Sequence, residues 1–122
     1  VELTICGRTV HVLNTHLGLW PRERPQQADR LLELLSLSRR DLTILMGDLN
    51  EWHGWGKSLR GWRRVFGSPA APVTFPARWP VLALDRIWIF PAQALLTVEA
   101  HDTPRSRLAS DHLPVKADIY LP

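Results

Sequence analysis

The chain has almost no cysteine and no long apolar run. Its single cysteine, Cys6, excludes an internal disulfide and leaves the redox compartment open. No apolar stretch approaches the roughly 18 residues that a membrane-spanning helix needs. The first residues also lack the basic end and the long apolar core of a signal peptide. We therefore expect a protein without a transmembrane segment, located in the cytoplasm.

Charge of one sign is not in large excess either. Lys and Arg number 15 against 12 Asp and Glu, so the net charge is only +3. The length of 122 residues and the hydrophobic share of 45% fit one globular domain and exclude disordered and collagen-like classes. The small basic excess weakly favours an anionic partner such as a phosphate ester. Six tryptophans are many for this length, and composition leaves open whether they form core, a stacking platform or an apolar rim.

The hydrophobic pattern changes period along the chain. Residues 1–14 alternate around the turn signal Gly7-Arg8, which predicts a β-hairpin with one buried face. From about Pro25 to Ser38 apolar residues recur at helical spacing, and Arg39-Arg40 suit the end of a helix. The pattern predicts an amphipathic helix after the hairpin.

The rest of the chain reads mainly as strands. Residues 42–46 are apolar on both faces, as in a strand covered on both sides. Residues 51–80 read as irregular loop with a short helix around 57–65, and residues 82–90 form a second apolar strand. Residues 94–101 and 114–121 alternate as half-exposed strands. The order of elements predicts an α/β fold with a layered sheet.

Polar side chains recur at the ends of these predicted strands. Ligands of layered α/β folds bind in the crevice outside strand ends, so such residues are candidates for one site. The candidates are His16, Asp48, Asn50, Asp85, Asp111 and His112.

Each candidate also has a purely structural explanation. His16 resembles many histidines that only satisfy local hydrogen bonds. Asp48 and Asn50 have the residue types of an Asx-turn. Asp85 can pair with Arg86, and Asp111 can cap a turn. The conjunction of all these groups is harder to explain structurally than any one of them.

Four segments carry a family resemblance. "NTHLG", "MGDLNEW", "LDRIWI" and "SDHLPV", in this order, resemble the C-terminal half of the endonuclease/exonuclease/phosphatase superfamily, over about Val10 to Leu121. That superfamily includes deoxyribonucleases, abasic-site endonucleases, inositol-phosphate phosphatases and sphingomyelinases. Glu23-Arg24, "TFP" at Thr74 to Pro76 and the Trp-rich loop are most similar to compact bacterial members.

The resemblance implies both a fold and a reaction. The fold is half of a four-layer αββα sandwich, with one mixed, mostly antiparallel sheet and one or two helices on its outer face. The reaction is hydrolysis of a phosphodiester or phosphomonoester by in-line attack of water, assisted by Mg²⁺ or Mn²⁺.

The resemblance also implies a role for each catalytic candidate. Asp48 would orient or deprotonate the attacking water, and Asn50 would donate to the phosphate or hold Asp48. His112 would contact the scissile phosphate, with Asp85 fixing its ring orientation. His16 would be a second phosphate-binding group.

The metal site implied by the resemblance is incomplete in this chain. Asp48, Asn50 and Asp111 would be its ligands, but the family's N-terminal half supplies an asparagine and the glutamate that is the principal ligand. We therefore expect residues 1–122 to form a single domain of this type that lacks its N-terminal half. The inner face of its sheet would be uncovered, and through it the chain would self-associate or bind the missing half.

Substrate and catalytic competence stay open at this stage. Nucleic acid, a phospholipid head group and small phosphoesters are all compatible with the core residues. The loop tryptophans Trp52, Trp55 and Trp62 suit stacking on bases or contact with lipid. The alternative is a non-catalytic binding or scaffolding module that engages nucleic acid or a protein partner through its Arg and Trp residues.

Overall fold

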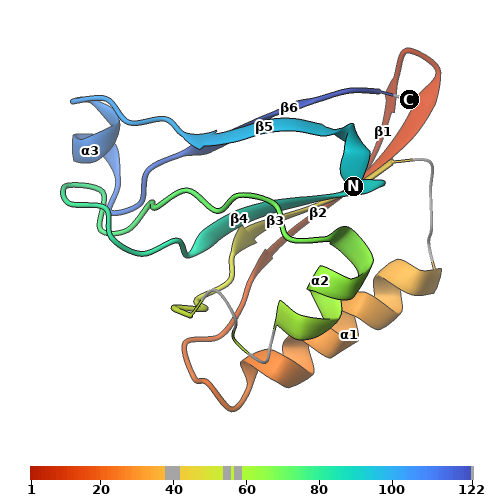
Figure 1. Ribbon diagram of the computed structural model, residues 1–122, viewed down its shortest axis with the longest axis horizontal. Helices are drawn as coiled ribbons and strands as arrows, with labels where there is room; N and C mark the ends of the chain where they lie inside the picture. The colour runs from red at the N-terminus through yellow and green to blue at the C-terminus, as the bar shows by residue number, and fades with distance from the viewer. Residues whose placement is uncertain (38–41, 54–55, 57–58, 122) are drawn as a thin grey trace.

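One mixed sheet of four strands forms the centre of the molecule, in the order β1-β2-β3-β4 (Figure 1). The computed structural model describes residues 1–37, 42–53, 56 and 59–121. β1 and β2 are antiparallel, β2 and β3 parallel, and β3 and β4 antiparallel. The strands are β1 (Glu2–Ile5), β2 (Arg8–His16), β3 (Leu42–Asp48) and β4 (Asp85–Phe90).

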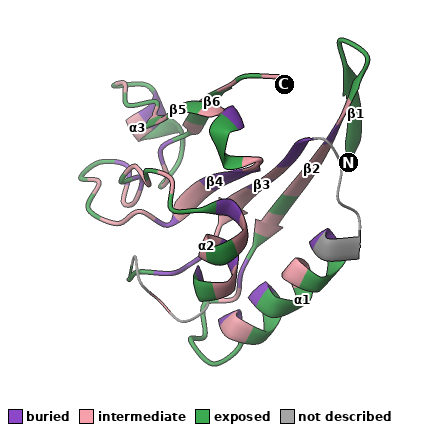
Figure 2. Ribbon diagram, turned by 45° about the vertical axis from the view of Figure 1, so that its right-hand side comes forward, coloured by how far each residue is buried: buried purple, intermediate pink, exposed green. Residues whose placement is uncertain are grey.

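The predicted N-terminal hairpin is present, with its turn one residue earlier than predicted. Cys6 and Gly7 connect the strands, and both have positive φ, at 50° and 76°. Positive φ at two central residues gives the turn the twist that a two-residue hairpin requires. The expected buried face is absent from β1, because all four of its residues are exposed (Figure 2). β1 is therefore an exposed edge strand.

Two helices cover one face of the sheet (Figure 1). They are α1 (Arg24–Leu37), close to the predicted helix, and α2 (Arg60–Phe66). The predicted helix end at Ser38, the pair Arg39-Arg40 and the predicted start of the second helix at Lys57 lie outside the described residues.

Tryptophan forms the centre of this helix-side core. The Trp62 and Trp88 rings meet edge to face with centroids 5.0 Å apart, and the Trp62 indole N–H donates to the carbonyl of Ala28 at 2.9 Å. The stacking or lipid contact considered for Trp62 was therefore wrong, because Trp62 is fully buried in α2, within the short helix predicted around residues 57–65. Trp52 is 63% exposed, as a loop tryptophan should be, and Trp55 lies outside the described residues.

A second, two-stranded antiparallel sheet lies on the opposite face (Figure 1). Its strands are β5 (Leu95–Ala100) and β6 (Val115–Ile119), preceded by the 3-10 helix η2 (Ala92–Ala94) and joined through α3 (Ser106–Ala109). β6 alternates between exposed and half-buried residues, as predicted, and β5 does so after a register shift between Leu95 and Thr97.

This second sheet corrects the expectation of an uncovered inner face. β5 and β6 share a core with the large sheet in which Val10, Leu42 and Ile89 are almost fully buried. Other apolar residues of that face, such as Ile44 and Met46, stay half-buried. The chain's own last hairpin thus covers part of the face that was expected to be bare.

The molecule has three layers: the helices α1 and α2, the mixed four-stranded sheet and the small two-stranded sheet. Together they form a partial α/β sandwich. The predicted mixed sheet with two helices on its outer face is confirmed. None of the described helices is both long enough and apolar enough to cross a membrane.

Candidate active site

Strand register gathers three of the candidate residues at one edge of the large sheet. His16 is the register partner of Asp48, and Asp48 is the register partner of Asp85. β2 and β3 end at this edge and β4 begins there, because β4 runs antiparallel to β3. Side chains alternate along a strand, so Asp48 lies on the same face as Ile44 and Met46, the face that carries β5 and β6.

A glycine lets β2 and β3 approach closely just before Asp48. Gly47 has φ +142°, and a Cβ atom there would meet the carbonyl oxygen of Thr15 at 1.7 Å. Only a residue without a side chain fits this contact. The residue type at position 47 therefore sets the spacing between the strand ends that carry His16 and Asp48.

His112 joins the cluster from the loop before β6. Its Nδ1 lies 2.7 Å from Oδ2 of Asp85, and its Nε2 lies 3.9 Å from Oδ2 of Asp48. The Thr74 hydroxyl donates to the same oxygen of Asp85 at 2.5 Å. The Phe75 ring lies against the imidazole, with centroids 4.8 Å apart. Asp85 and Phe75 together fix the orientation of the His112 ring.

Backbone hydrogen bonds hold the His112 loop in place. The N–H of Leu113 donates to the carbonyl of Thr74 at 2.9 Å, and the N–H of Ala77 donates to the carbonyl of Asp111 at 2.6 Å. Thr74 is completely buried. The buried segment around Thr74 therefore fixes the position of the loop that carries His112.

The charges around His112 raise its pKa. Partial burial lowers the pKa of the imidazole, but the hydrogen bond that it donates to Asp85 and the negative charges of Asp85, Asp48 and Asp111 outweigh it. The net effect is a pKa above the ordinary value, so the imidazolium form persists to higher pH. A positively charged donor at this position suits a site for an anion.

Asp48 has contacts on both of its oxygens. The backbone N–H of Asn50 donates to its Oδ1 at 2.9 Å, and Nε2 of His16 lies 3.5 Å from its Oδ2. The Asx-turn considered for these two residues is therefore present, beside the cluster and compatible with it. The Asn50 side chain is buried and donates through Nδ2 to the carbonyl of Leu17 at 2.7 Å, which ties the loop after β2 to the loop after β3.

Asp48, Asp85 and His112 can each offer one ligand atom within 4.8 Å of one another. Carboxylate oxygens are the ligands that Mg²⁺ and Mn²⁺ prefer, and imidazole suits the softer of the two. The two carboxylates of this group suit a hard divalent cation, but Oδ2 of Asp85 already accepts hydrogen bonds from His112 and Thr74, and His112, with its raised pKa, is a donor here. Asp111 is exposed, and its Oδ1 accepts from the Ser110 hydroxyl at 3.3 Å.

Two contributors to this geometry had no role in the sequence prediction. Thr74 and Phe75 belong to the "TFP" segment, which was noted only as part of the resemblance. Their contacts with Asp85 and His112 depend on a loop that returns to the strand ends, and no hydrophobic period marks such a loop. The quoted motif was the one available signal.

The fold and this cluster agree with one family of α/β sandwich proteins. The sequence pattern of the Endonuclease/Exonuclease/phosphatase family matches residues 3–112, and the chain belongs to this family. The family acts on nucleic acids and other phosphoesters and typically depends on divalent metal ions.

Individual relatives cover the chain almost completely. It is 34% identical to the uncharacterized protein YbhP of Escherichia coli K12 over 124 residues, 94% of this chain and 48% of that protein. The chain thus spans about half the length of the curated relatives it matches.

Solved structures agree on the fold. The endonuclease/exonuclease/phosphatase from Bacteroides vulgatus superimposes with a TM-score of 0.76 at 19% identity, covering 96% of this chain and 51% of that one. Truncated TDP2 of Caenorhabditis elegans gives a TM-score of 0.60 at 25% identity, covering 95% and 56%.

Proposed function

We propose that the protein of which this chain is part hydrolyses phosphodiesters with the help of Mg²⁺ or Mn²⁺. The observation that carries the proposal is the cluster of Asp48, Asp85 and His112, in which one carboxylate oxygen or imidazole nitrogen from each residue lies within 4.8 Å of the others. Family membership supports phosphoester chemistry of this kind.

The roles follow from the contacts. Asp48 lies at the strand end with one oxygen turned toward both imidazoles, so it accepts the proton of the attacking water. His112, held by Asp85 and with its pKa raised, donates a hydrogen bond to a phosphoryl oxygen as negative charge develops there. The imidazole of His16 is exposed and near Asp48, where it would bind a second phosphoryl oxygen.

Asp48 would hold the metal ion, with Asn50 and Asp111 as the further ligands that the resemblance implies. When bound, the ion supplies positive charge against the phosphoryl oxygens. We assign the missing principal ligand, a glutamate, to a part of the protein outside this chain.

That missing half would also complete the sandwich. The half-buried residues Val12, Ile44 and Met46 on the inner face would pack against it, or against a second copy of this chain. A strictly monomeric mass of the isolated 122-residue chain at micromolar concentration would contradict such association.

Hydrolysis of bis(4-nitrophenyl) phosphate by the full-length protein, with and without Mg²⁺, tests the proposal. Asp48→Asn should lower the rate by about 10²–10⁴, the usual contribution of a general base. His112→Asn should also lower the rate, and His101→Asn is its matched control, because His101 is an exposed histidine that does not belong to the cluster. Equal activity of the Asp48 variant and the wild type, or hydrolysis unaffected by removal of metal, would contradict the assignment.

A cytoplasmic location stays a prediction.

A further inference from the structure

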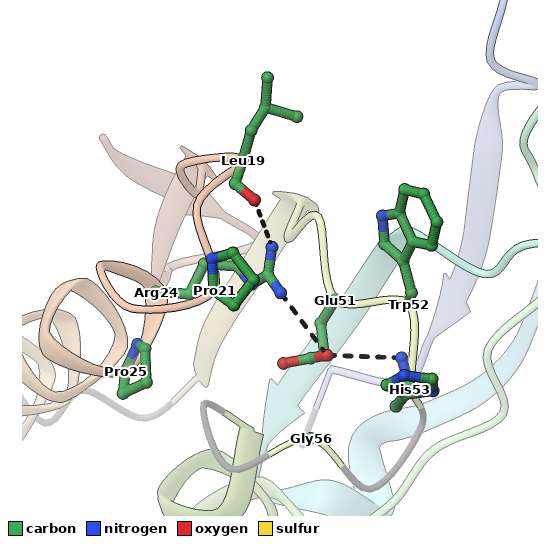
Figure 3. Close-up of a pocket in the computed structure, with 8 residues that line it drawn as sticks. All are labelled: Leu19, Pro21, Arg24, Pro25, Glu51, Trp52, His53 and Gly56. Atoms are coloured by element: carbon green, nitrogen blue, oxygen red, sulfur yellow. Dashed lines mark hydrogen bonds and ion pairs between the residues drawn. The ribbon is translucent and has the colours of Figure 1, made fainter.

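A buried ion pair joins the two loops that follow β2 and β3 (Figure 3). Arg24 stands at the start of α1, where the first loop ends, and Glu51 lies in the second loop. Only 8% of each side chain is exposed, and Nη2 of the guanidinium lies 3.9 Å from Oε1 of the carboxylate. The cost of removing two charges from water offsets their attraction, so such a pair is weak evidence for stability. In some proteins a buried pair instead selects one arrangement of the chain, and the contacts of this pair indicate the same here.

Each member of the pair also holds the backbone of its own loop. Nη1 of Arg24 donates to the carbonyl of Leu19 at 2.8 Å (Figure 3). Oε1 of Glu51 accepts from the backbone N–H of His53 at 3.4 Å, and a Cβ atom at Gly56 would lie 2.1 Å from the carboxyl carbon of Glu51. The carboxylate is therefore packed against the backbone at position 56, where only glycine leaves room for it. Through these contacts the ion pair connects one loop backbone to the other.

The two loops begin at residues of the candidate active site. The first starts directly after His16 and the second directly after Asp48. The backbone N–H of Leu17 donates to the carbonyl of Asp48 at 3.0 Å, and that of Asn50 donates to Oδ1 of the Asp48 carboxylate at 2.9 Å. Asn50 has a positive φ of 49°, which is uncommon for residues other than glycine and persists only where the surrounding structure holds it. Its neighbour Glu51 supplies this support, because the ion pair fixes the Glu51 side chain.

We infer that Arg24 and Glu51 are positioning residues for the reaction proposed above. The pair fixes the backbone of Asn50, whose N–H orients the carboxylate of Asp48 beside Nε2 of His16, 3.5 Å away. The expected effect on rate rests on the proposed function of Asp48, whereas the expected effect on the loops does not. A displacement of about 1 Å at a reacting group costs about 100-fold in rate. Because the pair acts through the loop backbone, its loss should lower kcat and leave KM nearly unchanged.

Removal of both charges separates positioning from stability. The double variant Arg24→Met/Glu51→Leu has no unpaired buried charge, so its urea midpoint should stay close to that of the wild type, whereas Arg24→Met alone should lower it. In the full-length protein with Mg²⁺ and bis(4-nitrophenyl) phosphate, we expect the double variant to have a kcat at least about 10-fold lower and a KM within about twofold. If the double variant does not fold, Glu51→Gln, which keeps the size of the side chain, decides by the same criteria.

The control is a pair on the surface of the small sheet. Lys116→Gln/Glu99→Gln removes an exposed ion pair of 2.6 Å between β6 and β5, and should leave kcat unchanged.

Hydrogen exchange reports on the loops independently of activity. NMR of the full-length protein measures exchange of the Leu17 and Asn50 amides, which donate to Asp48, beside the Leu113 amide, which donates to Thr74 and lies outside both loops. In the double variant, exchange at Leu17 and Asn50 should be at least about fivefold faster, and exchange at Leu113 should be unchanged.

A folded double variant with a kcat within about twofold of the wild type, or with unchanged exchange at Leu17 and Asn50, would overturn the positioning pair. Equal acceleration at Leu113 would overturn it as well, because it would show general destabilisation. Faster exchange at the two loop amides in a protein without metal-dependent hydrolysis would refute the proposed function and leave the effect of the pair on the loops standing.

Discussion

Asp85→Asn removes one negative charge from the centre of the candidate site and keeps the size of the side chain. In the wild type, Oδ2 of Asp85 accepts from His112 at 2.7 Å and from Thr74 at 2.5 Å. Asparagine keeps an acceptor oxygen but not the charge that strengthens both hydrogen bonds. His112 should then be less often protonated at neutral pH and less firmly oriented.

The contacts give the size of the effect. A hydrogen bond to a charged group contributes about 1.5–3 kcal/mol, and roughly a quarter of each side chain is open to solvent, which favours the lower part of that range. A loss of about 1.5–2 kcal/mol lowers the rate about 10- to 30-fold.

The assay is hydrolysis of bis(4-nitrophenyl) phosphate by the full-length protein in Mg²⁺, with a thermal melt of each variant. Asp102→Asn is the matched control, because Asp102 is paired with Arg107 on the surface. We expect the control to retain full activity. If Asp85→Asn stayed within about twofold of the wild type while folded, the Asp85–His112 pair would have no part in catalysis.

Three further predictions concern stability. Gly47→Ala should destabilise the protein by more than about 3 kcal/mol in urea denaturation, because the new methyl group would collide with the carbonyl of Thr15 in β2 at a strained φ. Gly18→Ala is the control and should cost less, because its methyl group would meet only side chains that can move. Trp62→Phe should cost about 1–3 kcal/mol through the lost indole hydrogen bond, against less than about 0.5 kcal/mol for Trp79→Phe; equal costs would argue against the packing described. The raised pKa of His112 stabilises the folded state fully below the unfolded value of about 6.5 and less as pH rises through the folded pKa, so His112→Asn should flatten the decline in urea midpoint as pH rises above about 6.5.

Local patterns predicted the elements well. The helical period before Ser36 and the doubly apolar run from Leu42 to Met46 correspond to α1 and β3. Trp62 lies in the predicted short helix but was given a solvent-facing role, because seven helical residues in a Gly-, Pro- and Trp-rich stretch leave too little periodic signal to show which face is buried. The partial cover of the inner face was also missed, because alternation along β5 and β6 marks a half-buried strand but does not say which sheet it joins.

The candidate site was predictable in its members more than in its contacts. The quoted motifs contain His16, Asp48, Asp85 and His112, and in the structure these four side chains lie in one cluster. The support from Thr74 could not be derived from spacing, because it is a tertiary contact across a loop. The roles assigned to these residues stay predictions.

The register of β3 between its two neighbours makes folding and site assembly a single event. A slip of one residue would turn Asp48 toward the helices and Leu45 toward β5 and β6, exchanging a carboxylate for a leucine in the core. A misregistered molecule is therefore both unstable and without its cluster. Because misregistered molecules are less stable, the folded population consists of molecules in which His16, Asp48 and Asp85 lie side by side at the strand ends.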